Sequence, residues 1–234
     1  MNAFQSASGR TLVKICGLKT PDAALCAARC GADFIGFVFA ESRRRVTAEE
    51  AAAIAKGGEV GRFGAKIAGV FVNPDPEQLE RVMETVRLEA IQLSGSEPPA
   101  FVREVKARFP DTAVIKAIDA SGEPEGRTQG GSAAERLLAY AGAADAILLD
   151  TAGGGTGRQF DWAVLPGCKA AAAKIGVPLF VAGGLDPDNV AGLVRRYRPD
   201  GVDVSSGVET GGAKDAAKIA AFIERVRTIE TQRA

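Results

Sequence analysis

The sequence contains no histidine, and it has only one tryptophan and two tyrosines among its 234 residues. Without histidine, neither a Ser-His-Asp triad nor a Cys-His pair can form, so acid–base chemistry must come from Asp, Glu, Cys, Lys or Tyr. A zinc site also has little support, because Cys26 and Cys30 lie four residues apart but no second ligand pair accompanies them. We therefore expect no metal.

The sequence also lacks an excess of charge of either sign, since 29 Lys and Arg residues balance 29 Asp and Glu residues. General binding to phosphate backbones needs a positive excess, so we expect no nucleic-acid partner. No apolar run approaches the roughly 20 residues that span a bilayer, and residues 1–10 lack the apolar stretch of a secretory signal. These absences predict a cytoplasmic protein with no membrane partner, whose cysteines stay reduced.

Short apolar runs rich in Val and Ile alternate with longer helical patterns along the whole chain. This alternation predicts successive βα units with a parallel sheet. The expected strands are residues 11–16, 33–39, 66–72, 90–93, 113–117, 146–150, 179–182 and 202–205. The expected helices are residues 21–30, 48–56, 76–86, 99–109, 133–141, 162–174, 187–197 and 213–227, with Asp75, Asp161 and Asp186 as caps.

The number of units favours one fold over its alternative. Eight βα units match an α/β protein with a single (β/α)₈ barrel of about 250 residues, whereas doubly wound open sheets usually have fewer strands. No composition break or long linker marks a second domain. We predict one barrel domain over residues 1–234, with residues 1–10 as a polar N-terminal extension and residues 229–234 as a C-terminal tail.

In such a barrel the active site lies at the C-terminal ends of the strands. At the end of the first strand, Lys14 and Cys16 alternate with Val13 and Ile15, so the polar pair is expected to face the barrel axis. A lysine charge beside the thiol would favour the thiolate and make Cys16 a base or nucleophile. The alternative is a small buried cysteine without chemistry.

Asp150 closes the apolar run 146–150, and a charge at the end of a buried strand needs a reason. It is either a functional acid or a cap for the loop that follows. The glycine-rich segment 153–157 comes directly after it, which suits a loop that contacts a ligand. Glycine richness alone is weak evidence.

Small residues follow the last two expected strands, at Gly183 and Gly184 and at Ser206 and Gly207. These are the two places where barrels frequently hold a phosphate on backbone N–H groups. The alternative is that these glycines merely end the strands.

Cationic side chains also occur at this end of the barrel. Arg43, Arg44 and Arg45 follow the second strand, where a guanidinium could hold a ligand carboxylate by paired hydrogen bonds, or could simply be solvated. Lys116 could form a Schiff base, although Lys14 and Lys116 could equally be buried charges paired with carboxylates such as Asp203.

Taken together, these residues resemble the phosphoribosylanthranilate isomerase family. The similarity extends from Lys14 to about Lys214, in the family's order and near its spacing. It covers KICG at 14–17, GFVF at 36–39, SxR at 42–44, GVFVN at 69–73, ILLDT at 147–151, GGTG at 154–157, FDW at 160–162, AGGL at 182–185 and DVSSGVE at 203–209.

The resemblance implies an isomerase of tryptophan biosynthesis that needs no cofactor. It converts N-(5-phosphoribosyl)anthranilate to 1-(2-carboxyphenylamino)-1-deoxyribulose 5-phosphate by an Amadori rearrangement. By the same resemblance, Asp150 is the general acid for the ribose ring oxygen and Cys16 the general base for the C2 proton. Arg44, with Arg45 as the alternative, holds the anthranilate carboxylate. Phosphate binding falls to Gly183, Gly184, Ser206 and Gly207, with the loop around Gly155 nearby.

One position departs from the family pattern. After the fourth strand the family usually has Gln-Leu-His-Gly, whereas this chain has Ser94 at the histidine position. Serine keeps a hydrogen-bonding group but cannot change charge near neutral pH, so any proton-handling role of that histidine is absent here. Because the acid and the base are both present, we expect activity to survive.

Three other functions compete with this hypothesis. The first is a related isomerase of histidine biosynthesis, which uses two aspartates and is disfavoured by Cys16. The second is a lyase that forms a Schiff base through Lys116. The third is a phosphate-ligand binding protein that has lost turnover, which Ser94 would allow. The expected partner is a small phosphoribosyl substrate, and the chain could act as a monomer or a homodimer.

Overall fold

The computed structural model describes residue 4 and residues 9–121, 131–151 and 159–231. Parallel strands β1 to β8 form a closed barrel in sequence order, with β1 paired to both β2 and β8. The prediction of a (β/α)₈ barrel is confirmed. The strands are β1 (Leu12–Cys16), β2 (Phe34–Val38), β3 (Lys66–Phe71), β4 (Ala90–Leu93), β5 (Ala113–Asp119), β6 (Ala146–Asp150), β7 (Leu179–Val181) and β8 (Gly201–Val204).

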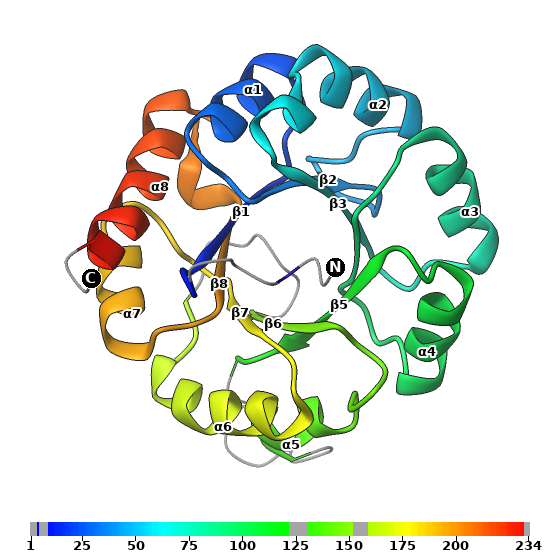
Figure 1. Ribbon diagram of the computed structural model, residues 1–234, viewed down its shortest axis with the longest axis vertical. Coiled ribbons are helices and arrows are strands. Elements are labelled where there is room, and N and C mark those ends of the chain that lie inside the picture. The colour runs from blue at the N-terminus through cyan, green and yellow to red at the C-terminus, as the bar shows by residue number, and fades with distance from the viewer. Residues whose placement is uncertain (1–3, 5–8, 122–130, 152–158, 232–234) are drawn as a thin grey trace.

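A ring of helices surrounds the strands (Figure 1). Helix α8 contacts both α7 and α1, which closes the ring. The helices are α1 (Pro21–Arg29), α2 (Ala48–Gly57), α3 (Pro76–Thr85), α4 (Pro99–Arg108), α5 (Ala133–Leu138), α6 (Leu165–Ile175), α7 (Val190–Tyr197) and α8 (Ala216–Thr231). Short 3₁₀ turns add η1 (Val60–Phe63), η2 (Trp162–Val164) and η3 (Ser206–Val208).

The two faces of each strand have different environments. Val13 and Ile15 are fully buried in the large core between the barrel and the helices, whereas Cys16 packs inside the barrel with Val38 and Val70. This confirms the expected alternation at β1. The strand pattern therefore directs Cys16 toward the barrel interior and leaves the outer core entirely apolar at these positions.

Aromatic rings fill the N-terminal end of the barrel. Phe4 packs against Phe34 and Phe180, with ring centroids 5.5 and 5.6 Å apart, and all three side chains are buried. Gly201 lies directly against the Phe180 ring, and a Cβ there would overlap it. Part of the predicted polar extension 1–10 thus supplies an apolar side chain to the core. This packing leaves the opposite end of the barrel for a polar site.

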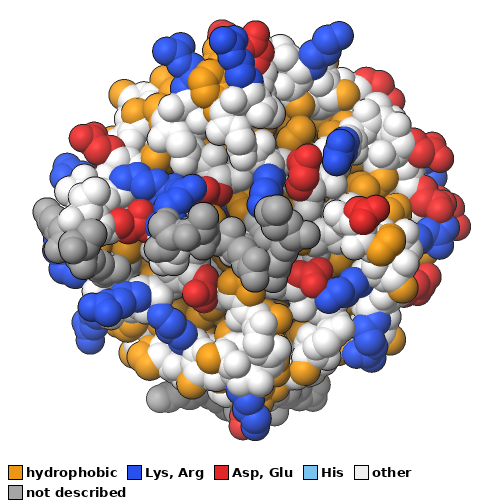
Figure 2. All heavy atoms as spheres, viewed as in Figure 1, with side chains coloured by type: hydrophobic (Ala, Val, Ile, Leu, Met, Phe, Trp, Pro, Cys, Tyr) orange, Lys and Arg blue, Asp and Glu red, His pale blue; other side chains and the backbone are white. Residues whose placement is uncertain are grey.

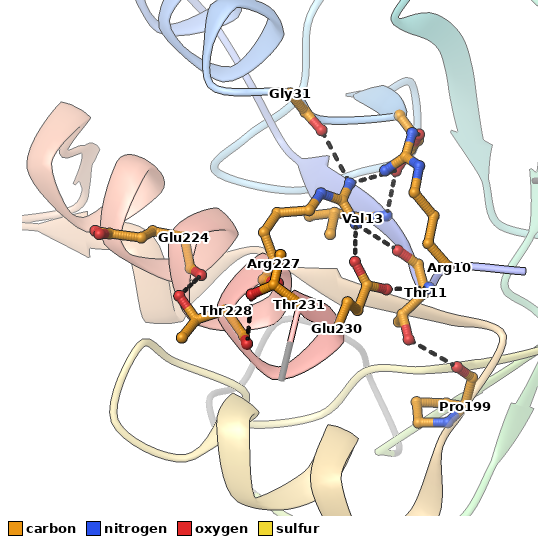
Figure 3. Close-up of polar contacts among 11 residues, drawn as sticks. Arg10, Thr11, Val13, Gly31, Pro199, Glu224, Arg227, Thr228, Glu230 and Thr231 are labelled. Carbon is orange, nitrogen blue, oxygen red and sulfur yellow. Dashed lines mark hydrogen bonds and ion pairs between the residues drawn. The ribbon is translucent and has the colours of Figure 1, made fainter. Parts of the chain in front are cut away.

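Helix α8 is anchored to the start of β1 by a polar cluster (Figure 3). The Arg227 guanidinium donates to the Thr11 carbonyl at 2.7 Å and to an Asp33 oxygen at 2.9 Å, and Glu230 accepts from the Thr11 N–H. Ile229 is buried, and α8 continues to Thr231. The expected C-terminal tail 229–234 is therefore wrong at its start, because residues 229–231 belong to the helix.

Several helix boundaries also differ from the sequence expectation. Asp75 caps α3 and Asp161 caps η2, as predicted, each accepting a backbone N–H. Helix α7 begins at Val190 rather than at 187, because the Asp186 carboxylate bonds the N–H groups of Asp188 and Asn189 and forms a turn there instead. Helix α8 begins at Ala216, because a short hairpin of β9 (Glu209–Thr210) and β10 (Ala213–Lys214) precedes it.

The surface carries charges of both signs. On the face shown in Figure 2, which is viewed as in Figure 1, Lys and Arg side chains are interspersed with Asp and Glu. Within the described part of the chain, no helix combines the length and apolar character that crossing a bilayer requires.

Candidate active site

A cavity of about 410 Å³ lies at the C-terminal end of the barrel. It brings together four of the residues singled out from the sequence, namely Cys16, Arg44, Ser94 and Asp150. They reach it from β1, the loop after β2, the segment after β4 and the end of β6. Its lining residues are Cys16, Val38, Ala40, Glu41, Ser42, Arg44, Val70, Val72, Gln92, Ser94, Gly95, Ala117, Ile118, Asp119, Asp150, Thr151, Asp203 and Ser205.

Cys16 ends β1, next to Gly36 of β2 in the parallel register. A Cβ at Gly36 would lie 3.0 Å from the Cys16 Sγ atom, so the glycine provides the space that the thiol occupies. Burial raises the pKa of the Cys16 thiol, and the lowering effect of Lys14 does not offset it. Lys14 thus favours the thiolate, as expected, but burial has the larger effect on the pKa of Cys16.

Lys14 itself is held in a buried ion pair. Its Nζ atom lies 3.0 Å from both carboxylate oxygens of Asp203, and Lys14 is only 1 % exposed. The two residues face each other in the β1–β8 register. Burial lowers the pKa of Lys14, but Asp203 and Cys16 raise it by more. The net pKa lies above its ordinary value, so the ammonium stays charged. This is the buried ion pair with Asp203 that the sequence analysis gave as the alternative role of Lys14, and Asp203 opposes the effect of Lys14 on the pKa of Cys16.

Asp150 ends β6 and lines the same cavity as Cys16. One carboxylate oxygen accepts the Thr151 N–H at 2.7 Å. Burial raises the pKa of Asp150 to about 6, with a further raising contribution from Asp203 and opposing contributions from the Thr151 N–H and Lys14. A carboxyl group with this pKa is partly protonated near neutral pH, and perturbed pKa values of this kind are typical of functional sites.

Arg44 is buried, and its side chain is held from two sides. Its Nε and Nη2 atoms donate to the two carboxylate oxygens of Glu209 at 2.6 and 3.1 Å. Its stem lies against Gly17, where a Cβ would be 2.5 Å from the Arg44 Cδ atom. Arg45, in contrast, pairs with exposed Glu41 and is not among the cavity-lining residues. Arg44 is therefore the arginine of this run that reaches the cavity.

Glu209, the last residue of the 203–209 motif, binds three cationic side chains, a role that was not predicted from the sequence. Besides Arg44, its carboxylate contacts Arg43 at 2.5 Å and the Lys214 Nζ atom at 3.0 Å. Although burial raises the pKa of Glu209, the hydrogen bonds from Arg44 and Lys214 lower it to about 2. Glu209 therefore stays ionised and fixes three cations beside the cavity. Its partners lie far apart in the sequence, so only the fold brings them together.

The two predicted phosphate turns contact each other. Gly207 packs so closely on the Leu185 carbonyl that a Cβ would overlap it. Gly183 and Gly184 both have positive φ, 77° and 65°, a conformation that glycine adopts without strain. Ser206 and Gly207 lie in η3. These four residues are not among the lining residues of the 410 Å³ cavity, although their neighbour Ser205 is. Gly155 lies outside the described residues.

The model of the family described as N-(5'phosphoribosyl)anthranilate (PRA) isomerase matches residues 13–225 of this chain. The chain belongs to this isomerase family. The resemblance drawn from the sequence motifs is thus confirmed, and the match includes both Cys16 and Asp150.

Named relatives support the same assignment. The chain is 39 % identical to the N-(5'-phosphoribosyl)anthranilate isomerase of Geobacillus thermodenitrificans over 222 residues, which cover 92 % of this chain and 93 % of the relative. It is 40 % identical to the enzyme of that name from Dehalococcoides mccartyi over 231 residues, covering 94 % and 97 %.

Solved structures of this isomerase family have the same fold. The phosphoribosyl anthranilate isomerase of Thermotoga maritima superposes with a TM-score of 0.77 at 37 % identity, covering 93 % of this chain and 99 % of the other. The Thermus thermophilus protein gives 0.76 at 35 % identity, covering 94 % and 100 %. A further member was solved with reduced 1-(o-carboxyphenylamino)-1-deoxyribulose 5-phosphate and gives 0.75 at 37 % identity, covering 93 % and 99 %.

Lys116 forms a buried ion pair with Glu97. Its Nζ atom lies 2.6 Å from Glu97 and 2.8 Å from the Gly95 carbonyl, and the Lys116–Glu97 pair is almost fully buried. Glu97 in turn accepts the N–H groups of Asn73 and Gly95, which ties the loops after β3 and β4 together. Lys116 is not a lining residue of the 410 Å³ cavity, so the Schiff-base hypothesis gains no support.

Ser94, the residue at which the sequence departs from the expected family pattern, lies directly after β4. Its Oγ atom accepts a hydrogen bond from the Gln92 Nε2 atom at 3.0 Å, and both residues line the cavity. The site therefore has a neutral hydrogen-bonding pair at this point. Among the described residues, no group of three or more His, Cys, Asp or Glu side chains is arranged to hold a metal ion.

Proposed function

We propose that this chain catalyses the Amadori rearrangement of N-(5'-phosphoribosyl)anthranilate to 1-(2-carboxyphenylamino)-1-deoxyribulose 5-phosphate in tryptophan biosynthesis. The observation that carries the proposal is the joint position of Cys16 and Asp150. They end strands β1 and β6 and line one cavity that Arg44 also reaches. An acid, a base and an anion-binding group at one barrel mouth are the parts that this reaction needs.

Asp150 is the general acid in this proposal. The first step opens the ribose ring, and the ring oxygen must gain a proton as its bond to C1 breaks. A carboxyl group with a pKa of about 6 supplies that proton more readily than an ordinary aspartate at neutral pH. The product of the step is a protonated Schiff base between C1 and the anthranilate nitrogen.

Cys16 is the general base. It takes the proton from C2 of the Schiff base, and the electrons of that C–H bond neutralise the iminium nitrogen to give an enolamine. Because burial raises the pKa of Cys16, its thiolate is a minor species but a strong base once formed. The enolamine then becomes the ketone when C1 gains a proton and the C2 hydroxyl loses one.

Two further regions bind the substrate in this account. The Arg44 guanidinium holds the anthranilate carboxylate through charge-assisted hydrogen bonds. The phosphate binds at the turns of Gly183, Gly184, Ser206 and Gly207, where small residues let an anion approach backbone N–H groups. The close packing of Gly207 on Leu185 supports a joint role, since it puts these turns side by side.

The remaining expectations follow from this activity. Proton transfer and ring opening by side chains need no cofactor, and the only partner required is the phosphoribosyl substrate. A biosynthetic enzyme of this kind would act in the cytoplasm, as one domain. A Thermotoga maritima relative is described as monomers of a dimeric phosphoribosylanthranilate isomerase, so we keep both the monomer and the homodimer as candidate states of this chain.

The test is a fluorescence time course with freshly prepared N-(5'-phosphoribosyl)anthranilate. We expect the anthranilate emission to decay rapidly with the purified chain and with Cys168→Ser, a buried cysteine of α6 outside the cavity. Absence of decay with correctly folded protein that still binds a product analogue would instead support the non-catalytic binding protein.

A further inference from the structure

Gln92 of β4 occupies an unusual position inside the barrel. Its residues on either side, Ile91 and Leu93, are fully buried in the outer apolar core, whereas Gln92 lines the 410 Å³ cavity. It is flanked in register by Val70 of β3 and Ile115 of β5. The residue is only 4 % exposed. A carboxamide thus lies between apolar neighbours in the lining of the cavity.

Only one end of this carboxamide is bonded within the described part of the chain. The Nε2 atom donates to the Ser94 Oγ atom at 3.0 Å. The Oε1 atom is fully buried and has no hydrogen-bond partner among the described residues. An unpaired polar atom in such a place costs stability, and a folded protein keeps one where function requires it.

The surrounding charges indicate what kind of group pairs with Oε1. The two buried lysines of the barrel are each bound to a carboxylate, Lys14 to Asp203 and Lys116 to Glu97. Because each ammonium is already paired with a carboxylate, we do not expect either lysine to be the donor to the Gln92 Oε1 atom. A neutral donor suits the buried oxygen better than a second ion, because an ion would lose its hydration without a counter-charge.

The Ser94 hydroxyl further restricts which chemical group of a ligand can bind beside Gln92. Its oxygen accepts from Gln92, so its own hydrogen is available to donate to a ligand atom. A ligand hydroxyl can donate to Oε1 and accept from Ser94 at the same time. An aryl amine N–H can donate, but its nitrogen lone pair is delocalised into the ring and accepts poorly.

We propose that Gln92, together with Ser94, is a substrate-binding pair that holds one hydroxyl of the substrate's sugar portion. This inference rests on the proposed function, since it takes the sugar of a phosphoribosyl compound as the occupant. In this proposal the unpaired Oε1 atom of Gln92 binds the ligand and does not stabilise the fold.

The experiment compares binding with stability in the same variants. Reduced 1-(o-carboxyphenylamino)-1-deoxyribulose 5-phosphate serves as the non-reacting probe, measured by calorimetry with wild type, Gln92→Leu and Gln92→Met. The matched control is Gln78→Leu on helix α3, outside the cavity. We expect Gln92→Leu and Gln92→Met to bind roughly 5- to 100-fold more weakly, and the control to bind as wild type does.

Urea unfolding distinguishes a ligand-binding role of Gln92 from a structural one. Removal of an unpaired buried polar atom should leave the urea midpoint of the Gln92 variants equal to or above that of wild type. Analogues of the probe that each lack one sugar hydroxyl should show the coupling. For the analogue that lacks the hydroxyl bound by Gln92, wild type and Gln92→Leu should have equal affinity.

Two results would overturn the inference. The first is unchanged affinity in both Gln92 variants, as an ordered water on Oε1 would give. The second is that Gln92→Leu binds every deoxy analogue more weakly than wild type does, and by the same factor. Both leave the proposed function intact if wild type still turns over the substrate. Failure of the proposed function shows instead as wild type that neither reacts with the substrate nor binds the probe.

Discussion

Arg44 and Glu209 form a two-point contact at the mouth of the barrel, with N–O distances of 2.6 and 3.1 Å. The carboxylate comes from the β8 side and the guanidinium from the loop after β2, so the contact spans the two strands that flank β1. Paired geometry of this kind fixes the plane of a guanidinium. Glu209 thereby determines how Arg44 is presented to the cavity.

Replacement of Glu209 by glutamine should weaken substrate binding more than catalysis. The amide keeps the shape but removes the charge that orients Arg44, so we expect KM to rise roughly 5- to 50-fold, with a smaller change in kcat. Steady-state kinetics test this, with Glu80→Gln as the control because Glu80 forms an exposed pair with Arg108 on the outer helices. An unchanged KM in Glu209→Gln would remove this role.

The pH profile should have its lower limb near the pKa of Asp150. Since Asp150 ionises at about pH 6 and the pKa of Cys16 lies above its ordinary value, the competent form, with protonated Asp150 and ionised Cys16, is a minor species. Its fraction is constant between the two pKa values and decreases about tenfold per pH unit below the lower one. We expect kcat/KM to be flat above about pH 6 and to fall below it.

This profile needs a control for the substrate phosphate, whose second pKa is also about 6. The affinity of a non-reacting product analogue, measured over the same pH range, isolates the effect of phosphate ionisation on binding. A kcat/KM limb that merely follows the affinity of the analogue would contradict the assignment to Asp150.

Asp150→Asn should be more stable than wild type at alkaline pH. The folded-state pKa of Asp150, about 6, lies above its ordinary value of 3.8, so the folded protein binds the extra proton. Stability contributed by that proton is present at low pH and lost as pH rises through about 6. At pH 8 the buried charge then costs about 1–3 kcal/mol, which asparagine avoids.

Urea unfolding at pH 4 and pH 8 measures this difference directly. The gain in Asp150→Asn should be present at pH 8 and close to zero at pH 4. An equal difference at the two pH values would mean that the charge of Asp150 is not the cause.

Gly207→Ala should separate the two proposed phosphate turns. The new Cβ would overlap the Leu185 carbonyl, so one turn must move. We expect a loss of at least about 2 kcal/mol of stability or a clear loss of affinity for the phosphorylated probe. Gly192→Ala is the matched control, because this α7 glycine has open space around it and alanine should stabilise the helix by about 0.5–1 kcal/mol. Equal behaviour of the two variants would contradict the close packing of the turns.

Much of the fold could be predicted from the sequence. Each apolar run formed a barrel strand because local alternation and burial agree along β1 to β8. The start of α7 could not be predicted, since Asp186 bonds two successive N–H groups and holds a turn where a proline suggested a helix. The start of α8 was shifted by a hairpin that has too little apolar character to be recognised in the sequence.

The candidate site shows a similar division. Cys16, Asp150 and Arg44 were identifiable because strand ends and motifs mark them. The raised pKa of Cys16 was not, because its largest cause is burial of the thiol, which depends on packing in the closed barrel. Glu209 ends the 203–209 motif, but its contact with Arg44 was not predicted, since the two residues are 165 positions apart in the sequence. Contacts of this kind leave no local signal.

The most direct test of the account is a joint measurement of turnover and probe affinity in Cys16→Ser and Asp150→Asn. If the two residues act as base and acid on one bound substrate, kcat should fall by at least about 100-fold in each variant. The affinity for reduced 1-(o-carboxyphenylamino)-1-deoxyribulose 5-phosphate should stay close to that of wild type. Wild-type turnover in both variants would contradict the assignment of Cys16 and Asp150 as the catalytic pair.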